Sequence, residues 1–163
     1  MSKGDMFLKV EGAKQGPIKG EAQDSVHGSE IDVLGWSWGM RAQTAMGAGG
    51  VTGKSTLQEL VVSKKVDSAT TALMSALRNN EQLKKVVLTV RKAGKDPIEY
   101  FKITLEGARI TALDVVSEDE GSNEQLGEKL SIAFTSVSVE YTPQGEDGTP
   151  RGGMSFETDI SPT

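Results

Sequence analysis

The sequence predicts a mainly β fold with one helix, arranged as a barrel or as a sandwich of two sheets. Three observations lead to this prediction. Several segments alternate large apolar residues with small or polar ones, which is the period of a strand. One segment has the apolar spacing of an amphipathic helix. One strand shifts its apolar phase by a single residue, which is typical of a bent sheet.

The longest alternating segment runs from Glu30 to Arg41. Since successive side chains of a strand point to opposite faces, we expect one face to hold the large residues, with the two tryptophans as core anchors. A sugar-stacking platform is the alternative use of the tryptophans. The other face suits contact with a neighbouring subunit or a passing polypeptide. The large residues are Leu34, Trp36, Trp38 and Met40, and the opposite face has Ile31, Val33, Gly35, Ser37 and Gly39.

The predicted helix spans Ser68 to Asn79 and follows a β segment at Leu57–Val66. Asp67 or Ser68 is the expected N-cap. We expect the helix to cover an opening or a flank of the barrel. Its apolar stripe consists of Ala69, Ala72, Leu73, Ala76 and Leu77.

The second half of the chain continues as strands. Alternating residues at 86–90 and 98–105, separated by turn residues 93–97, predict a hairpin. The segment Leu130–Tyr141 carries the phase shift, so we predict a β-bulge near Thr135–Ser136. A short final strand is expected at 154–156.

We expect one domain over residues 1–163, because 163 residues is an ordinary length for a chain with a single core. Residues 42–55 are rich in glycine and are predicted to form an extended loop. A second exposed loop is expected at 117–123, and residues 143–163 are predicted to form a flexible tail.

Charge argues against nucleic acid as a partner. The chain has 18 Lys and Arg against 23 Asp and Glu, a formal net charge of -5, which is opposite in sign to a phosphate-binding surface. Residues 114–163 hold 2 basic and 11 acidic side chains, so this end of the sequence is an acidic strip. A solvated face that aids solubility is the simplest interpretation of the strip.

Composition also removes most catalytic and metal chemistry. With 0 Cys and 1 His, the chain has no thiol nucleophile and no multi-histidine metal site. Residues 48–55 resemble a relaxed P-loop, but a predicted strand follows them where phosphate binding needs a helix. His27 lies in a predicted turn without the context of a catalytic triad. We therefore expect no catalytic residue, no metal and no cofactor.

No stretch of the sequence predicts a signal peptide or a membrane span. The chain starts without a basic segment followed by an apolar run. The longest apolar runs, such as Leu60–Val62, are far below the roughly 18 residues of a spanning helix. We expect the protein to fold in the cytoplasm, and any secretion to occur without an N-terminal signal peptide.

The sequence resembles the haemolysin-coregulated protein (Hcp) family, the tube subunits of bacterial type VI secretion systems. The resemblance extends from about Asp5 to Tyr141. It implies a two-sheet β-barrel with one helix, related to phage tail tubes, that assembles as a hexameric ring. It also implies ring stacking, effector proteins in the lumen, and spike and sheath components as partners, with no membrane insertion. The segments that carry the resemblance are Asp5–Lys9, Gly20–Glu21 with His27, Glu30–Met40, Leu88–Gly94 and Glu99–Phe101.

Two surfaces are predicted from this resemblance and the residue patterns. The lumen-facing and effector-contacting residues are Val33, Gly35, Ser37 and Gly39, with burial at a subunit seam as the alternative for this face. The uneven charge leads to a hypothesis for ring stacking through Arg41, Gly49, Gly50, Lys54, Glu118, Asp119 and Glu120. A monomeric ligand-binding β-barrel, an effector adaptor and an enzyme that uses the glycine-rich loop as a nucleotide cradle are the alternative functions.

Overall fold

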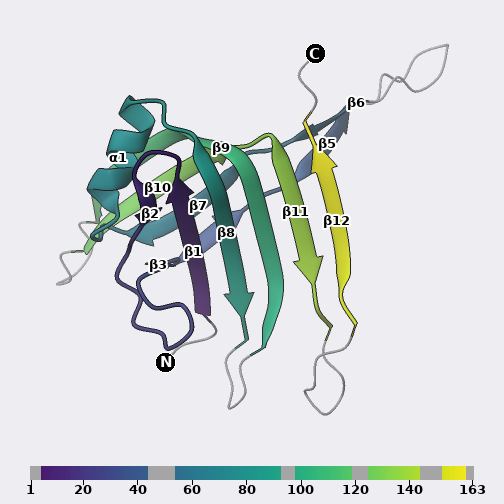
Figure 1. Ribbon diagram of the computed structural model, residues 1–163, viewed down its shortest axis with the longest axis horizontal. Helices are drawn as coiled ribbons and strands as arrows, with labels where there is room; N and C mark the ends of the chain where they lie inside the picture. The colour runs from purple at the N-terminus through teal and green to yellow at the C-terminus, as the bar shows by residue number, and fades with distance from the viewer. Residues whose placement is uncertain (1–4, 44–53, 93–97, 119–124, 144–151, 161–163) are drawn as a thin grey trace.

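The computed structural model describes residues 5–43, 54–92, 98–118, 125–143 and 152–160. Within these residues the protein has twelve strands and one helix (Figure 1). In chain order they are β1 Asp5–Gly12, β2 Gly16–Ile18, β3 Ile31–Asp32, β4 Gly35–Ser37, β5 Met40–Gln43, β6 Lys54–Leu57, β7 Leu60–Lys65, α1 Thr70–Arg78, β8 Leu83–Arg91, β9 Glu99–Glu118, β10 Gln125–Ala133, β11 Ser136–Tyr141 and β12 Met154–Asp159.

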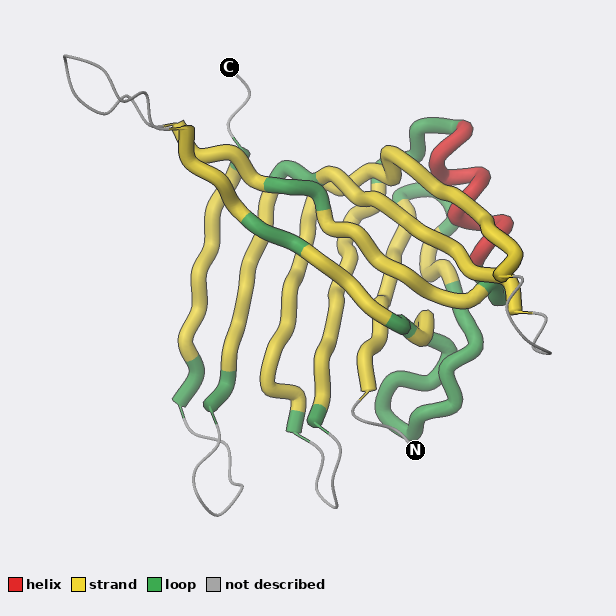
Figure 2. Tube along the Cα trace, turned by 180° about the vertical axis from the view of Figure 1, so that it is seen from behind, coloured by secondary structure: helices red, strands yellow, loops and turns green. Residues whose placement is uncertain are grey.

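The strands form two sheets, which we call sheet A and sheet B. Sheet A has the order β2, β1, β8, the first half of β9, β11 and β12, with β3 also on β1. Sheet B consists of the second half of β9, then β10, β7 and β4. A separate two-stranded ribbon, β5–β6, extends from the end of sheet B. Figure 2 shows sheet B crossing sheet A obliquely. The prediction of a mainly β, two-sheet fold with one helix is confirmed.

Strand β9 belongs to both sheets, because it bends at Gly107. Its residues 101–106 pair with β11 in sheet A, and residues 109–118 pair with β10 in sheet B. Gly107 has a φ of 57°, a left-handed conformation that residues with a Cβ rarely adopt. A Cβ at this position would also collide with the side chain of Thr135. Glycine is therefore required at the corner where the two sheets meet.

The predicted bulge near Thr135–Ser136 is a boundary between two strands. β10 ends at Ala133 in sheet B and β11 begins at Ser136 in sheet A. Between them, the backbone N–H and the hydroxyl of Thr135 both donate to the carbonyl oxygen of Glu106, at 3.1 and 3.2 Å. The phase shift in the sequence thus marks the passage of the chain from one sheet to the other. The irregularity within a strand lies earlier, between Ser131 and Ile132.

The prediction of one continuous strand from Glu30 to Arg41 is wrong, because the segment changes pairing partner. The N–H of Val33 donates to Met6 of β1, whereas the N–H of Leu34 donates to Ser63 of β7. Relative to the prediction, the buried and exposed faces are reversed in this part of the segment. Ile31 and Val33 are buried, whereas Leu34 is 57% exposed. Residues 31–37 consequently join β1 of sheet A to β7 of sheet B.

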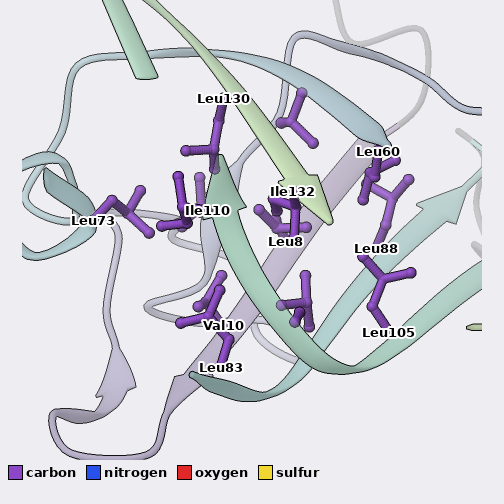
Figure 3. Close-up of a cluster of buried hydrophobic side chains, with 14 of the residues drawn as sticks. Leu8, Val10, Leu60, Leu73, Leu83, Leu88, Leu105, Ile110, Leu130 and Ile132 are labelled. Carbon is purple, nitrogen blue, oxygen red and sulfur yellow. The ribbon is translucent and has the colours of Figure 1, made fainter. Parts of the chain in front are cut away.

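The core between the sheets is made of aliphatic side chains from both of them (Figure 3). Trp36 and Trp38 pack against this core, as predicted, and Trp36 stacks on Phe101 with ring centroids 5.5 Å apart. The completely buried side chains include Leu8, Leu60, Leu73, Leu83, Leu88, Leu105, Leu130 and Ile132.

The helix lies at the end of the molecule opposite β12 (Figure 1). It begins two residues later than predicted, at Thr70, with Ala69 as N-cap in place of Asp67 or Ser68. The Asp67 carboxylate still accepts the N–H of Ala69 at 3.0 Å, just before the first turn. The predicted apolar stripe is confirmed, since its members are buried or pack against the core.

Four further predictions concern the described residues. The hairpin of β8 and β9 is confirmed, although its turn 93–97 lies outside them. The segment 57–66 divides into the end of β6 and β7, and the ends of the predicted 42–55 loop belong to β5 and β6. Residues 154–159 of the predicted flexible tail form β12, which pairs with β11 along its whole length.

A buried ion pair connects the helix to sheet B. Lys64 of β7 and Glu128 of β10 are direct cross-strand neighbours, and both side chains have no solvent exposure. The ammonium lies 2.7 Å from the Glu128 carboxylate and 3.0 Å from that of Asp67. The hydroxyl of Thr70, in the first turn of α1, donates to Glu128 at 2.6 Å. These contacts fix the start of the helix against the sheet.

We predict that Glu128→Gln lowers the free energy of unfolding by about 3–5 kcal/mol, because it leaves the Lys64 ammonium buried without its main counter-charge. The double variant Lys64→Met, Glu128→Leu removes both charges and should cost less than the single variant. Chemical denaturation of the three proteins checks this. A double variant that is destabilised as much as Glu128→Gln, or more, would contradict the account.

Candidate functional site

The outer face of sheet B is the candidate functional site. The inner face of this sheet is identified by three buried residues of β7, which are Leu60, Val62 and Lys64. The alternating positions Val61 and Ser63 therefore point outward. Cross-strand partners share a face, so the pairing register identifies the other members of this surface.

Two rows of side chains cross the outer face. The first row is Ser37, Val61, Ser131 and Ala112, on β4, β7, β10 and β9. The second row is Gly35, Ser63, Lys129 and Asp114 on the same four strands. We call these eight residues the small-residue face.

The small-residue face is mostly uncharged and consists largely of short side chains. Six of its eight residues are Gly, Ala, Ser or Val, and Lys129 faces Asp114 in register. Ser37 and Ser63 are exposed. A Cβ added at Gly35 would meet no atom within 4 Å, so the surface beside this residue is open. Such a face offers many weak polar contacts and no large apolar anchor.

The predicted lumen residues divide between two environments. Gly35 and Ser37 lie on the small-residue face, and Gly39 follows β4 with open space beside its Cα. Val33 is 7% exposed and belongs to the core, so its assignment to the outer face is wrong. The reason is the change of pairing partner at Leu34, which inverts the alternation.

The sequence interpretation missed the members of this face on β7, β10 and β9. Their alternation is present in the sequence, since Val61 and Ser63 alternate with Leu60, Val62 and Lys64. Only the pairing register shows that they continue the rows that start at Ser37 and Gly35.

The predicted stacking residues lie at opposite ends of sheet B (Figure 1). Arg41 is exposed on β5 and Lys54 starts β6, beyond the Leu60–Ile132 end of the β7–β10 pair. Glu118 ends β9, beyond the Lys65–Gly127 end. Gly49, Gly50, Asp119 and Glu120 lie outside the described residues. Within one subunit Arg41 and the start of β6 lie at the opposite end of sheet B from the end of β9, so a contact between these described positions requires two copies.

A second polar cluster surrounds His27. Its Nδ1 is 2.9 Å from the carboxylate of Glu30 and its Nε2 is 2.6 Å from that of Glu99. The imidazole stacks on Phe7 with ring centroids 4.7 Å apart. Only the doubly protonated ring can donate to both carboxylates. Burial lowers the pKa of His27, but the two carboxylates outweigh it and raise the pKa above its usual value.

Arg91 binds the same segment and also lies over the Phe7 ring. Its guanidinium contacts Asp5 and Asp24, each at 2.6 Å, and its Cζ lies 5.1 Å from the centroid of the Phe7 ring. The Asp24 carboxylate also accepts the N–H groups of Val26 and His27. Hydrogen bonds from Arg91 and Val26 hold the pKa of Asp24 well below its usual range. Together the two clusters fix residues 24–30 onto β1, β8 and the start of β9.

We predict that stability falls as pH rises through the pKa of His27. The pKa of His27 is higher in the folded protein than its ordinary value of 6.5. Protonated His27 therefore stabilises the fold fully below pH 6.5, and this stabilisation is lost as the pH rises above the pKa of the folded protein. His27→Gln should remove this slope and cost about 1–3 kcal/mol near pH 6, from the loss of charged hydrogen bonds. Thermal unfolding between pH 6 and 9 measures both effects, and an unchanged slope in the variant would contradict the assignment. His27 is the only histidine in the sequence, so no second imidazole contributes.

Two other kinds of feature are absent from the described residues. No group of three or more His, Cys, Asp or Glu side chains among them is placed to hold a metal ion. None of the helices in this part of the chain is long and apolar enough to cross a membrane.

Comparison with known proteins identifies relatives of the whole chain. Residues 7–141 match the family described as "Type VI secretion system effector, Hcp". The protein named "Protein hcp1" of Pseudomonas aeruginosa is 39% identical over 152 residues, which cover 91% of this chain and 90% of that protein.

Solved structures agree with this match. Hcp1 from Salmonella typhimurium has a TM-score of 0.79 at 27% identity, covering 98% of this chain and 96% of that one. A type VI secretion system effector from Yersinia pestis has a TM-score of 0.76 at 28% identity, covering 96% of this chain and 100% of that one. Hcp proteins are structural, secreted proteins that form the stacked hexameric rings of the secretion tube. The chain belongs to the Hcp family of type VI secretion tube subunits.

Proposed function

We propose that copies of this chain close into rings with the small-residue face turned toward the channel, where it contacts effector proteins. The observation that carries the proposal is the pairing register that sets Ser37, Val61, Ser131 and Ala112 side by side across four strands. A channel that passes different proteins needs a wall without deep pockets or large apolar anchors, because such features bind one partner tightly.

The chemistry of this face suits weak and adaptable binding. Serine hydroxyls both donate and accept hydrogen bonds, so Ser37, Ser63 and Ser131 can pair with varied polar groups of a cargo protein. Each contact is weak, but a ring repeats it in every copy, and repeated contacts strengthen binding without a specific pocket. Spike and sheath components are the further expected partners, at the tube end and on its outer surface.

A monomeric ligand-binding barrel is the less favourable alternative. The space between the sheets, where a ligand would bind in such a barrel, is occupied by the completely buried side chains of the core. The features that remain for binding lie on outer surfaces, which supports assembly and protein contact.

We predict that the double variant Ser37→Tyr, Ser63→Tyr keeps the native ring mass but reduces effector co-purification at least tenfold. Both side chains are exposed on the small-residue face, so tyrosines there narrow the channel without entering the core. The matched control is Ser75→Tyr, on the exposed side of α1, which should retain normal cargo. Unchanged effector retention by intact rings of the double variant would overturn the lumen assignment.

We also propose that rings stack through charge, with Arg41 and Lys54 of one ring facing Glu118, Asp119 and Glu120 of the next, beside Gly49 and Gly50. The opposite placement of Arg41 and the end of β9 on each subunit supports a head-to-tail arrangement. A single exposed ion pair contributes only about 0–1 kcal/mol, so stacking depends on repetition around the ring.

Raising the salt concentration should therefore separate stacked tubes into rings before it separates rings into subunits, because salt screens exposed charges over about 10 Å at 0.1 M. Arg41→Glu should produce the same loss of stacking at low salt. Electron microscopy and sedimentation distinguish tubes, rings and monomers. Equal salt sensitivity of tubes and rings would exclude charge as the basis of stacking.

A further inference from the structure

Residues 19–30 lie between β2 and β3 and form a strap that closes on itself. The backbone N–H of Gly20 donates to the carbonyl oxygen of Ser29 at 2.8 Å, and the N–H of Ser29 donates to that of Ala22 at 2.9 Å. A third bond joins the N–H of Ala22 to the carbonyl oxygen of Glu30 at 2.9 Å. We call residues 19–30 the strap.

Three polar contacts attach the strap to other elements. One carboxylate of the strap accepts the backbone N–H of the residue two before α1, and a second carboxylate binds a guanidinium of β8. The imidazole of the strap contacts the first residue of β9. The strap therefore links the start of the helix to the β8–β9 hairpin. The three pairs are Glu21 with Ser68, Asp24 with Arg91 and His27 with Glu99, each at 2.6 Å.

The histidine contact differs from the Asp24–Arg91 contact in its response to pH. Hydrogen bonds from Arg91 hold the pKa of Asp24 well below its usual range, and hydrogen bonds to Asp24 and Asp5 raise the pKa of Arg91 further. This pair therefore keeps both charges near neutral pH, where an imidazole titrates. The charged groups of the elements around the imidazole are Asp5 of β1, Asp24 and Glu30 of the strap, Arg91 of β8 and Glu99 of β9.

Loss of one proton leaves the imidazole of His27 with a single N–H donor. The neutral ring can then donate to Glu30 or to Glu99, but not to both. The nitrogen without a proton presents a lone pair to a carboxylate, which can only accept, so that contact becomes repulsive. One of the two contacts must therefore open.

Two observations select the contact to Glu99 as the one that opens. The side chain of Glu30 is 16% exposed and that of Glu99 is 32% exposed, so an unpaired Glu99 carboxylate is hydrated more easily. The backbone N–H of Glu30 also donates to the carbonyl oxygen of His27 at 3.1 Å. This bond keeps Glu30 beside the imidazole in either protonation state.

We propose that the contact between His27 and Glu99 is a proton-controlled latch, closed while the imidazole carries both protons and open once Nε2 has released its proton to water. The Asp24–Arg91 contact stays closed, so the strap remains attached to β8 while it separates from the start of β9. Burial lowers the pKa of His27, but Glu30 and Glu99 raise it above 6.5, so the latch is closed in acidic solution and opens as the solution becomes alkaline. It lies within one subunit and does not depend on the ring.

Nitrogen-15 NMR of the full chain, labelled at histidine, tests the latch directly. The sequence has 1 His, so every imidazole signal comes from His27. In acidic solution both ring nitrogens should carry a proton. In alkaline solution the remaining proton should lie on Nδ1, and Nε2 should have the chemical shift of an unprotonated nitrogen.

Three outcomes of this titration would overturn the proposal. A neutral ring protonated mainly on Nε2 would mean that the contact to Glu99 persists and the contact to Glu30 opens. A mixture without a preferred form would mean that neither carboxylate holds the proton. A ring that is still doubly protonated at pH 9 would mean that the latch does not open.

A variant supplies the second test. Glu99→Gln removes the charge that faces Nε2 and should lower the pKa of His27 by about 1 unit, a tenfold loss of proton affinity. The matched control is Glu106→Gln, an exposed position on the same strand, which should leave this pKa unchanged. Circular dichroism checks that both variants fold. A folded Glu99→Gln protein with the wild-type pKa contradicts the latch, and the NMR titration of the wild type decides the matter if the variant does not fold.

Discussion

The bend of β9 at Gly107 is the constraint on which the rest of the structure depends. A single strand of 20 residues serves as a member of sheet A before the bend and of sheet B after it. The bend needs a left-handed backbone and the absence of a Cβ, because Thr135 occupies the space beside Gly107. Thr135 itself marks the point at which the chain returns from sheet B to sheet A. The angle between the sheets is therefore set by one close approach of two segments that are distant in the sequence.

The same bend leaves the two sheets out of line with each other. Sheet A runs past the core at β12, and sheet B runs past it at the start of β10. Elsewhere the contact between elements is tight: the Lys64–Glu128 pair holds the helix, and the His27 and Arg91 clusters hold residues 24–30. A subunit that is rigid in its centre and uncovered at both ends is well suited to a ring, because assembly needs no internal rearrangement. In the proposed ring the small-residue face lines the channel.

Hydrophobic periodicity correctly predicts the segments that keep the same neighbouring elements along their whole length. The β8–β9 hairpin, the apolar stripe of α1 and the core positions of Trp36 and Trp38 are examples. It failed where the chain changes partner, since alternation shows which residues share a face only while the strand remains in one sheet. For this reason periodicity assigns Val33 to the wrong face and predicts a bulge at the strand boundary near Thr135. The site was only half predictable for a related reason: Ser37 and Gly35 stand out in one segment, but Val61, Ser131 and Ala112 join them through cross-strand register.

The central claim is that copies of this chain close into a ring with the small-residue face toward the channel. Sedimentation equilibrium of the purified wild-type chain tests this claim most directly. The account predicts a species of six times the 17.3 kDa subunit mass. A stable species of 17.3 kDa at the same protein concentration would contradict it.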